Sequence, residues 1–362
     1  MKKILALVSA VAVTCTSLVG CGVVSNPSSS SNTSSVSTSS VTASSQAAGS
    51  AAEDYSNVTP TVTLRLSHQM AASHSINETA LYFADQVNQL SKGTMKVDVF
   101  EAATLGTESQ NLEALSAGTL DMAIIAVEFY TNVVPDVGAL VLPYLYKDYD
   151  SEYAVLSGEA GNLAKAEILK QCNVDVLDYY VLAFRQIFSK KKEIKTANDL
   201  AGLKIRVPES NLYVNTFSLL GAAPTPVAWG ETYTALDTGV VDGLENTPES
   251  ILSASMNEVT TYMNITNHIS APTTFSISHK VFEGLTAEQQ DILTKAAQAA
   301  SKFGLGLTQQ NDTAARDILK ESMTIVDTDV DSMKAKIDYD TFDCMKGNTA
   351  KKILESAQAA AK

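Results

Sequence analysis

The chain has 362 residues, with 26 lysines and arginines against 40 aspartates and glutamates and a formal net charge of −14. This length is enough for two domains, and the acidic excess makes nucleic acids and anionic lipid headgroups poor partners. An anionic ligand would therefore need locally placed arginines to overcome the background field.

The N-terminus has the pattern of an exported lipoprotein. A basic start at 1–3 precedes an apolar run at 4–19 that is too short to span a bilayer, as in a secretory signal. The run ends in a Leu-Val-Gly-Cys sequence at 18–21, which is typical of a bacterial lipobox. We expect residues 1–20 to be a lipoprotein signal peptide and Cys21 to carry a diacylglycerol that anchors the chain to the membrane. The alternative is an ordinary signal peptide that contains a cysteine.

A serine-rich stretch separates this signal from the rest of the chain. Residues 24–52 are dominated by Ser, Thr, Ala and Asn and carry no charge. Such a composition buries too little apolar surface to offset the backbone entropy of folding. We therefore expect residues 21–57 to be a flexible, lipid-anchored linker, which suits a Gram-positive cell surface somewhat better than a periplasm.

The first half of the remaining sequence alternates between strand and helix patterns. Apolar and polar side chains alternate at 61–67, as in a strand, and Leu81, Ala84, Val87 and Leu90 fall at helical spacing. These criteria predict, in order, strand 61–67, helix 76–92, strand 95–99, helix 108–117 and strand 122–127. This β-α-β-α-β order predicts an open α/β sheet, in which ligands lie at the carboxyl ends of the strands.

The second half repeats the alternation without repeating the sequence. The patterns predict strand 204–207, helix 212–220, strand 225–228, helix 231–239 and strand 240–243. Further on, Thr286 and Gln289 form a capping box, which predicts the start of a long helix.

Catalytic and metal-binding signatures are missing from the sequence. It contains no phosphate loop, dinucleotide fingerprint, nucleophile elbow or zinc motif, which disfavours an enzyme and leaves no cofactor to expect. His68 and His74 do not have a ligand spacing on one helical face, so we expect no metal site. Cys172 and Cys344 could form a disulfide, but two lone cysteines far apart in sequence are more often free and buried.

Several ordered motifs resemble those of one family of transport proteins. They are LGTE at 105–108, GTLDM at 118–122, GLKIRVPE at 202–209, PTP at 224–226, WGETYTALDTGVVDGLEN at 229–246 and TNH at 266–268. Through them, the sequence from 61 to about 345 resembles the DctP-type extracytoplasmic subunits of tripartite ATP-independent periplasmic (TRAP) transporters. The commonest family form of the long motif ends in Gln-Glu-Asn-Pro. Here Leu244 replaces the glutamine and Thr247 the proline, and Asn246 stays in register.

The resemblance implies a two-lobed α/β fold like that of periplasmic binding proteins. Its lobes would close over the ligand about a hinge, and a long helix would brace both lobes. By this resemblance lobe I comprises 58–182 plus about 271–310, and lobe II comprises 183–270 plus about 311–362. The partners would be a small carboxylate and the small and large membrane subunits of a TRAP transporter. The protein would lie at the outer face of the cytoplasmic membrane or in the periplasm.

Three candidate site residues follow from the resemblance. Arg206 matches the family arginine that forms a two-pronged salt bridge with the ligand carboxylate, Arg185 matches a second arginine of the cleft, and Asn246 matches an amide that contacts the same carboxylate. The chemistry of Arg206 supports its role, because a planar guanidinium offers a donor fork that lysine lacks. The alternative for Arg206 is pairing with a surface acid such as Glu209.

Three further candidates rest on their places in the sequence. His68 ends the first predicted strand and Glu108 opens a predicted helix, where both would suit the hydroxyl groups of a ligand. For each, the alternative is a capping or core-edge hydrogen bond. Trp229 either stacks on the ligand or packs the lobe.

These residues indicate a small organic acid as the ligand. We favour a sugar acid, especially a hexuronate such as glucuronate or galacturonate, because His68 and Glu108 add polarity beyond one carboxylate anchor. Two alternatives stay open. A C4-dicarboxylate would use the second arginine for its second carboxylate, and a sensory binding protein would present its ligand to a membrane kinase.

Overall fold

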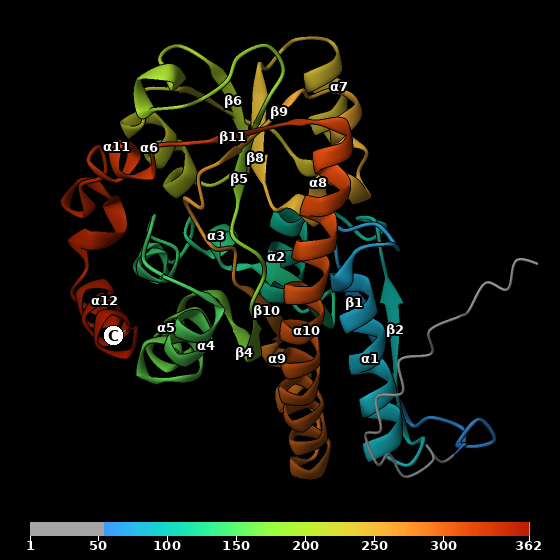
Figure 1. Cartoon of the computed structure of the whole chain (residues 1–362). Coiled ribbons are helices and arrows are strands. Elements are labelled where there is room, and N and C mark those ends of the chain that lie inside the picture. The colour runs from blue at the N-terminus through green and yellow to red at the C-terminus, as the bar shows by residue number, and fades with distance from the viewer. Residues whose placement is uncertain (1–53, 362) are drawn as a thin grey trace, which may run out of the picture. The chain divides into compact units, whose positions relative to one another are not determined.

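The computed structural model describes residues 54–361 of the chain, and these contain two β-sheets joined by a long helix (Figure 1). The signal segment, Cys21 and most of the predicted linker lie outside the described residues. No helix of the described part is long and apolar enough to cross a membrane.

The first sheet has five strands in the order β2-β1-β3-β10-β4. The strands are β1 (Val62–Ser67), β2 (Met95–Phe100), β3 (Met122–Ala126), β4 (Val174–Tyr180) and β10 (Thr273–Ser278). β1 pairs in parallel with β2 and β3, whereas β10 runs antiparallel to β3 and β4. The predicted β-α-β-α-β opening is therefore confirmed, and β10 makes the complete sheet mixed.

Two helices connect these opening strands, α1 (Ser75–Leu90) and α2 (Glu108–Ala117). α2 has the predicted bounds, begins with a capping box and ends at Gly118 in the left-handed region, with φ 71°. The apolar face predicted for α1 was partly right, because Val87 is buried and Ala84 is half-buried, whereas Leu81 and Leu90 are exposed. Ala80 and Phe83 complete the buried face, and Phe83 packs against Phe275 of β10 with ring centroids 5.1 Å apart.

The second sheet has six strands in the order β11-β9-β5-β8-β6-β7. They are β5 (Gln186–Ser189), β6 (Lys204–Val207), β7 (Ala223–Pro226), β8 (Gly243–Asn246), β9 (Tyr262–Ile265) and β11 (Thr324–Asp327). β6 pairs in parallel with β7 and β8, whereas β5 runs antiparallel to β8 and β9.

The strand predicted at 240–243 was misplaced, since β8 begins at Gly243. The preceding helix α7 (Thr232–Asp237) ends early, Gly239 turns the chain with φ 77°, and the side chain of Val240 is exposed. A Cβ at Gly243 would lie 2.4 Å from the carbonyl oxygen of Phe188, so the paired strand starts where only glycine fits. Asn246 is therefore the last residue of β8, at the carboxyl end of the strand.

The longest helix, α10 (Ala287–Ser322), runs along both sheets (Figure 1). It begins with the predicted capping box of Thr286 and Gln289, packs against α1 and β4, and also contacts α8 (Pro248–Ser253) beside the second sheet. Gly304 lies so close to β4 that a Cβ would meet the ring of Tyr180 at 2.5 Å. The long bracing helix of the two-lobed fold is thus confirmed.

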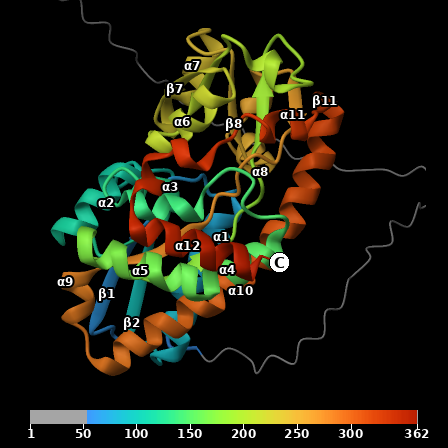
Figure 2. The ribbon, with the colours of Figure 1, turned by 90° about the vertical axis from the view of Figure 1, so that its left-hand side faces the viewer.

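The remaining helices cover the sheets. They are α3 (Val127–Tyr130), α4 (Tyr149–Ser157), α5 (Glu159–Cys172), α6 (Asn211–Leu219), α9 (His279–Glu283), α11 (Val330–Lys334) and α12 (Asn348–Ala360). α12 packs against α4 and α5, which belong with the first sheet (Figure 2). The predicted residue boundaries of the two lobes stay a prediction.

Two extended segments cross between the sheets side by side. The backbone N–H of Arg185 donates to the carbonyl of Ile269 at 2.8 Å, and Phe184 and Ser270 form an antiparallel bridge. The described cysteines, Cys172 and Cys344, are free and buried, as predicted.

Candidate ligand-binding site

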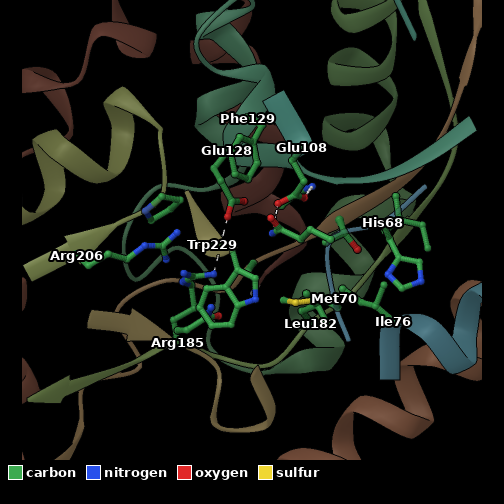
Figure 3. A pocket seen from close by; sticks show the side chains of 17 residues that line it. His68, Met70, Ile76, Glu108, Glu128, Phe129, Leu182, Arg185, Arg206 and Trp229 are labelled. Carbon is green, nitrogen blue, oxygen red and sulfur yellow. Dashed lines mark hydrogen bonds and ion pairs between the residues drawn. The ribbon is translucent and has the colours of Figure 1, made fainter. Parts of the chain in front are cut away.

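All six predicted site residues line one cavity between the two sheets (Figure 3). The cavity is narrow, with a volume of about 30 Å³, and it is partly open to solvent. Its lining consists of His68, Gln69, Met70, Ile76, Glu108, Ile124, Ala126, Glu128, Phe129, Leu182, Arg185, Arg206, Pro208, Trp229, Asn246, Ala271 and Thr273.

The ends of strands bring these side chains together. His68 directly follows β1, and Glu128 lies in α3, which directly follows β3. On the other side of the cavity, Arg206 lies near the end of β6 and Asn246 is the last residue of β8. Because β1 is parallel to β3 and β6 is parallel to β8, each sheet presents the carboxyl ends of these strands at one edge.

Arg185 is held in a buried ion pair. Its Nε donates to Oε2 of Glu245, and its Nη2 donates to Oε1 of Glu245 at 2.6 Å and to the Glu245 carbonyl at 3.2 Å. Nε2 of His268 lies 3.3 Å from the same carboxylate. Burial disfavours the charge of Arg185, but Glu245 outweighs this cost and raises the Arg185 pKa above its usual range. The donor fork of Arg185 is therefore already occupied by a protein carboxylate.

Arg206 is buried to a similar extent, with 2% of its surface exposed, but it has no acidic partner within 4 Å among the described residues. Its Nε and Nη2 both donate to the carbonyl of Val227, at 2.9 and 2.7 Å. The alternative pairing with Glu209 is absent from this arrangement. Burial lowers the pKa of Arg206 to about 10, so the guanidinium stays charged at neutral pH.

Trp229 lies beside this cation, with its ring centre 5.4 Å from the Arg206 guanidinium carbon. The indole also packs against two apolar cores, one beside each sheet. It therefore lines the cavity and packs the protein interior at the same time.

The two glutamates of the cavity differ in their hydrogen bonds. Oε1 of Glu108 accepts from the backbone N–H of Ala126 at 2.8 Å, and Oε2 accepts from the side-chain amide of Gln69. Oε2 of Glu128 is buried without a hydrogen-bond partner among the described residues, and Oε1 lies 3.8 Å from Nη1 of Arg185. Burial raises the pKa of Glu108 to about 8 and that of Glu128 to about 7.

The two histidines considered as a pair have separate roles. His68 lines the cavity, with Nε2 3.2 Å from Oδ1 of Asn77, and burial lowers its pKa to about 4, so the ring is neutral. His74 caps α1, where Nδ1 accepts from the backbone N–H of Ile76, and its Nε2 lies 3.1 Å from Oγ of Ser250. Within residues 54–361, no cluster of three or more metal-ligating side chains was found.

Sequence reasoning missed Glu128, Gln69 and Glu245. Glu128 carried a usable signal, because it follows the apolar strand at β3 in the same way that His68 follows β1. Glu245 offered less, since its partner Arg185 lies 60 residues away and only the folded chain joins them.

The sequence profile of the bacterial extracellular solute-binding proteins, family 7, known as DctP, matches residues 66–340. The chain belongs to the DctP family. A DctP-family relative, the 2,3-diketo-L-gulonate-binding periplasmic protein of Escherichia coli, is 30% identical over 269 residues, covering 74% of this chain and 82% of the relative. Membership in the DctP family makes the chain an extracytoplasmic solute-binding subunit of the TRAP type.

Two solved DctP-family structures share the fold. A TRAP periplasmic solute-binding protein from Roseobacter denitrificans, solved with bound L-galactonate, superposes with a TM-score of 0.76 at 30% identity, covering 84% of this chain and 100% of the other. One from Chromohalobacter salexigens, solved with bound D-glucuronate, gives a TM-score of 0.79 at 26% identity, covering 82% and 99%. The predicted two-lobed fold is confirmed.

The contrast between the two arginines predicts different effects on stability. Arg185→Gln should lower the free energy of unfolding by about 3–5 kcal/mol, because it leaves Glu245 buried without its counter-charge. Arg206→Gln should lower it by less than that, because it strips no ion-paired carboxylate of its counter-charge and gives up only the hydrogen bonds that the charged guanidinium donates to the carbonyl of Val227. Urea unfolding of the ligand-free variants at neutral pH measures both. Equal losses for the two variants would contradict this division.

Proposed function

We propose that this protein captures a sugar acid outside the cytoplasm and delivers it to the membrane subunits of a TRAP transporter. The observation that carries the proposal is Arg206, a buried guanidinium in a cavity wall with no acidic partner within 4 Å among the described residues. Burial of a charge is costly unless it is paired closely and hydrogen-bonded, and a ligand carboxylate would supply that close pairing.

The donor geometry of Arg206 suits a carboxylate. Of its five N–H groups, Nε and Nη2 use one each on the carbonyl of Val227. Three N–H groups remain, and the free one of Nη2 forms with the adjacent one of Nη1 a forked pair of donors at the end of the side chain. Such a fork binds the two oxygens of a carboxylate together.

The other polar residues favour one carboxylate and several hydroxyls over a dicarboxylate. The fork of Arg185 is bound to Glu245, so Arg206 is the one cation of the described lining whose donor fork no carboxylate occupies. Glu108, Glu128 and the neutral His68 are hydrogen-bonding groups of the kind that hydroxyls match. The L-galactonate and D-glucuronate bound by the two solved relatives support a ligand of this class. A hexuronate is the form of sugar acid that we propose.

The same residues support binding without turnover. The described lining contains no serine, cysteine or lysine, and the hydroxyl of Thr273 donates to the carbonyl of Tyr180 rather than to a base. We propose that the lobes close over the ligand about the two crossing segments and that the closed protein docks on the membrane subunits. No chemical step on the ligand is part of this proposal.

Affinity for D-glucuronate should depend on the guanidinium of Arg206. Arg206→Lys keeps the positive charge but loses the fork, so the dissociation constant should rise at least about tenfold, which is the loss of one or two charge-assisted hydrogen bonds. Titration calorimetry measures this change, and the melting temperature without ligand should move little. Arg316→Lys, on the outer part of α10 and paired with Asp312, is the matched control and should bind as the wild type does. Equal affinity in Arg206→Lys and wild type would remove Arg206 as the anchor.

We also propose that Cys21 carries the lipid that holds the protein at the membrane. The proposal rests on the Leu-Val-Gly-Cys sequence after the apolar run, since this part lies outside the described residues. Cys21→Ser should therefore be recovered in the soluble fraction, because the diacylglycerol supplies the two acyl chains needed for stable anchoring. Fractionation of cells that express each form is the measurement. A variant that stays with the membrane would contradict the proposal.

A further inference from the structure

Glu128 has one carboxylate oxygen in the cavity wall that the protein leaves without a hydrogen bond. Its Oε2 is buried without a hydrogen-bond partner among the described residues, and its Oε1 is 3.8 Å from Arg185, whose fork is already bound to Glu245. A buried carboxylate without hydrogen bonds is unfavourable, whereas a protonated carboxyl at the same place would gain a donor. Figure 3 shows the Glu128 side chain between Arg185 and Glu108, in the wall of the cavity.

The groups that face Glu128 come from five parts of the fold. They are Glu108 at the start of α2, Arg185 before β5, Arg206 in β6, Tyr213 in α6 and Glu245 in β8. Burial raises the pKa of Glu108 to about 8 and holds Tyr213 neutral, so neither adds a full charge at neutral pH. The positive charges of Arg185 and Arg206 then equal in number the negative charges of Glu245 and an ionised Glu128.

A carboxylate ligand disturbs this balance. Bound to Arg206, it adds one negative charge to a buried site whose charges already cancel. Two routes restore neutrality. The first, a rearrangement of Arg185 or Glu108, is closed, because the Arg185 fork and both oxygens of Glu108 are already hydrogen-bonded within the protein. The other route is a proton on Glu128, whose Oε2 has no hydrogen-bond partner among the described residues.

We propose that Glu128 takes up a proton from solvent when the cavity binds a sugar acid, and that its Oε2 then donates a hydrogen bond to a ligand oxygen. This inference rests on the proposed function and adds to it a proton that travels with the ligand into the site. The ligand keeps its own carboxylate charge, and water or buffer supplies the proton.

The direction of the pH dependence follows from linkage. Ligand raises the Glu128 pKa above its ligand-free value of about 7, so binding is strongest below about pH 7 and weakens as pH rises through the two values. The dissociation constant should rise by up to about tenfold per pH unit in that range, which is the limit for one proton. The number of protons taken up for each ligand bound should be largest slightly above neutral pH.

Titration calorimetry with D-glucuronate at about pH 6 and about pH 8.5 tests this inference. The wild type should bind about tenfold more weakly at the higher pH, and at about pH 8 its binding enthalpy should change with the protonation enthalpy of the buffer. Glu128→Gln carries an amide that is neutral at every pH. It should lose most of both dependences, since only Glu108, with a pKa of about 8, still titrates in this range, and it should bind more tightly than the wild type at the higher pH.

Two further variants separate this role from a structural one. Glu108→Gln disturbs the hydrogen bonds to Ala126 and Gln69, so it should weaken binding at both pH values and keep the pH dependence. Asp317→Asn removes an exposed carboxylate paired with Lys320 and should reproduce the wild-type profile.

The possible failures are distinct. Binding by the wild type with no pH dependence and no buffer dependence would overturn the inference and leave the proposed function intact. A pH dependence that persists unchanged in Glu128→Gln would also overturn it. Failure of any sugar acid to bind at either pH would contradict the proposed function itself, and this inference with it.

Discussion

The site depends on an unequal treatment of two buried arginines in one cavity. Arg185 is neutralised by Glu245 through two side-chain hydrogen bonds, and that pair is completed by His268. Arg206 is just as buried, but the protein gives it only the carbonyl of Val227 and the ring of Trp229. Since a guanidinium binds most strongly to a carboxylate that accepts from two of its N–H groups, the structure leaves that carboxylate to be supplied from outside.

The difference between the two arginines follows from where the strands of the two sheets end. Arg206 comes from β6 and Asn246 from β8 of the second sheet, while His68 and Glu128 follow strands of the first sheet. Neither sheet alone assembles the cavity. The crossing segments at Arg185 and Ile269, together with α10, hold the two halves next to each other. Ligand binding and the relation between the sheets are therefore parts of one mechanism.

The sequence predicted the parts of this arrangement that rest on local patterns. The periodicity at 61–127 gave the opening strands and helices, and the capping box at Thr286 located the start of α10. Local patterns failed where tertiary contacts decide. β8 begins at Gly243 because its backbone lies against Phe188, and α1 buries Phe83 rather than Leu81 because Phe83 packs against Phe275.

For the site, the sequence predicted six residues of one cavity. It could not reveal that Glu245 occupies the donor fork of Arg185, since that contact joins residues far apart in the chain.

A crystal structure of the protein with D-glucuronate tests the central claim most directly. We expect the ligand carboxylate to lie on Nη1 and Nη2 of Arg206 at about 2.7–2.9 Å, the usual range for charge-assisted hydrogen bonds, with the Arg185–Glu245 pair intact. A ligand carboxylate bound to Arg185 in place of Glu245, with Arg206 still held only by Val227, would contradict it.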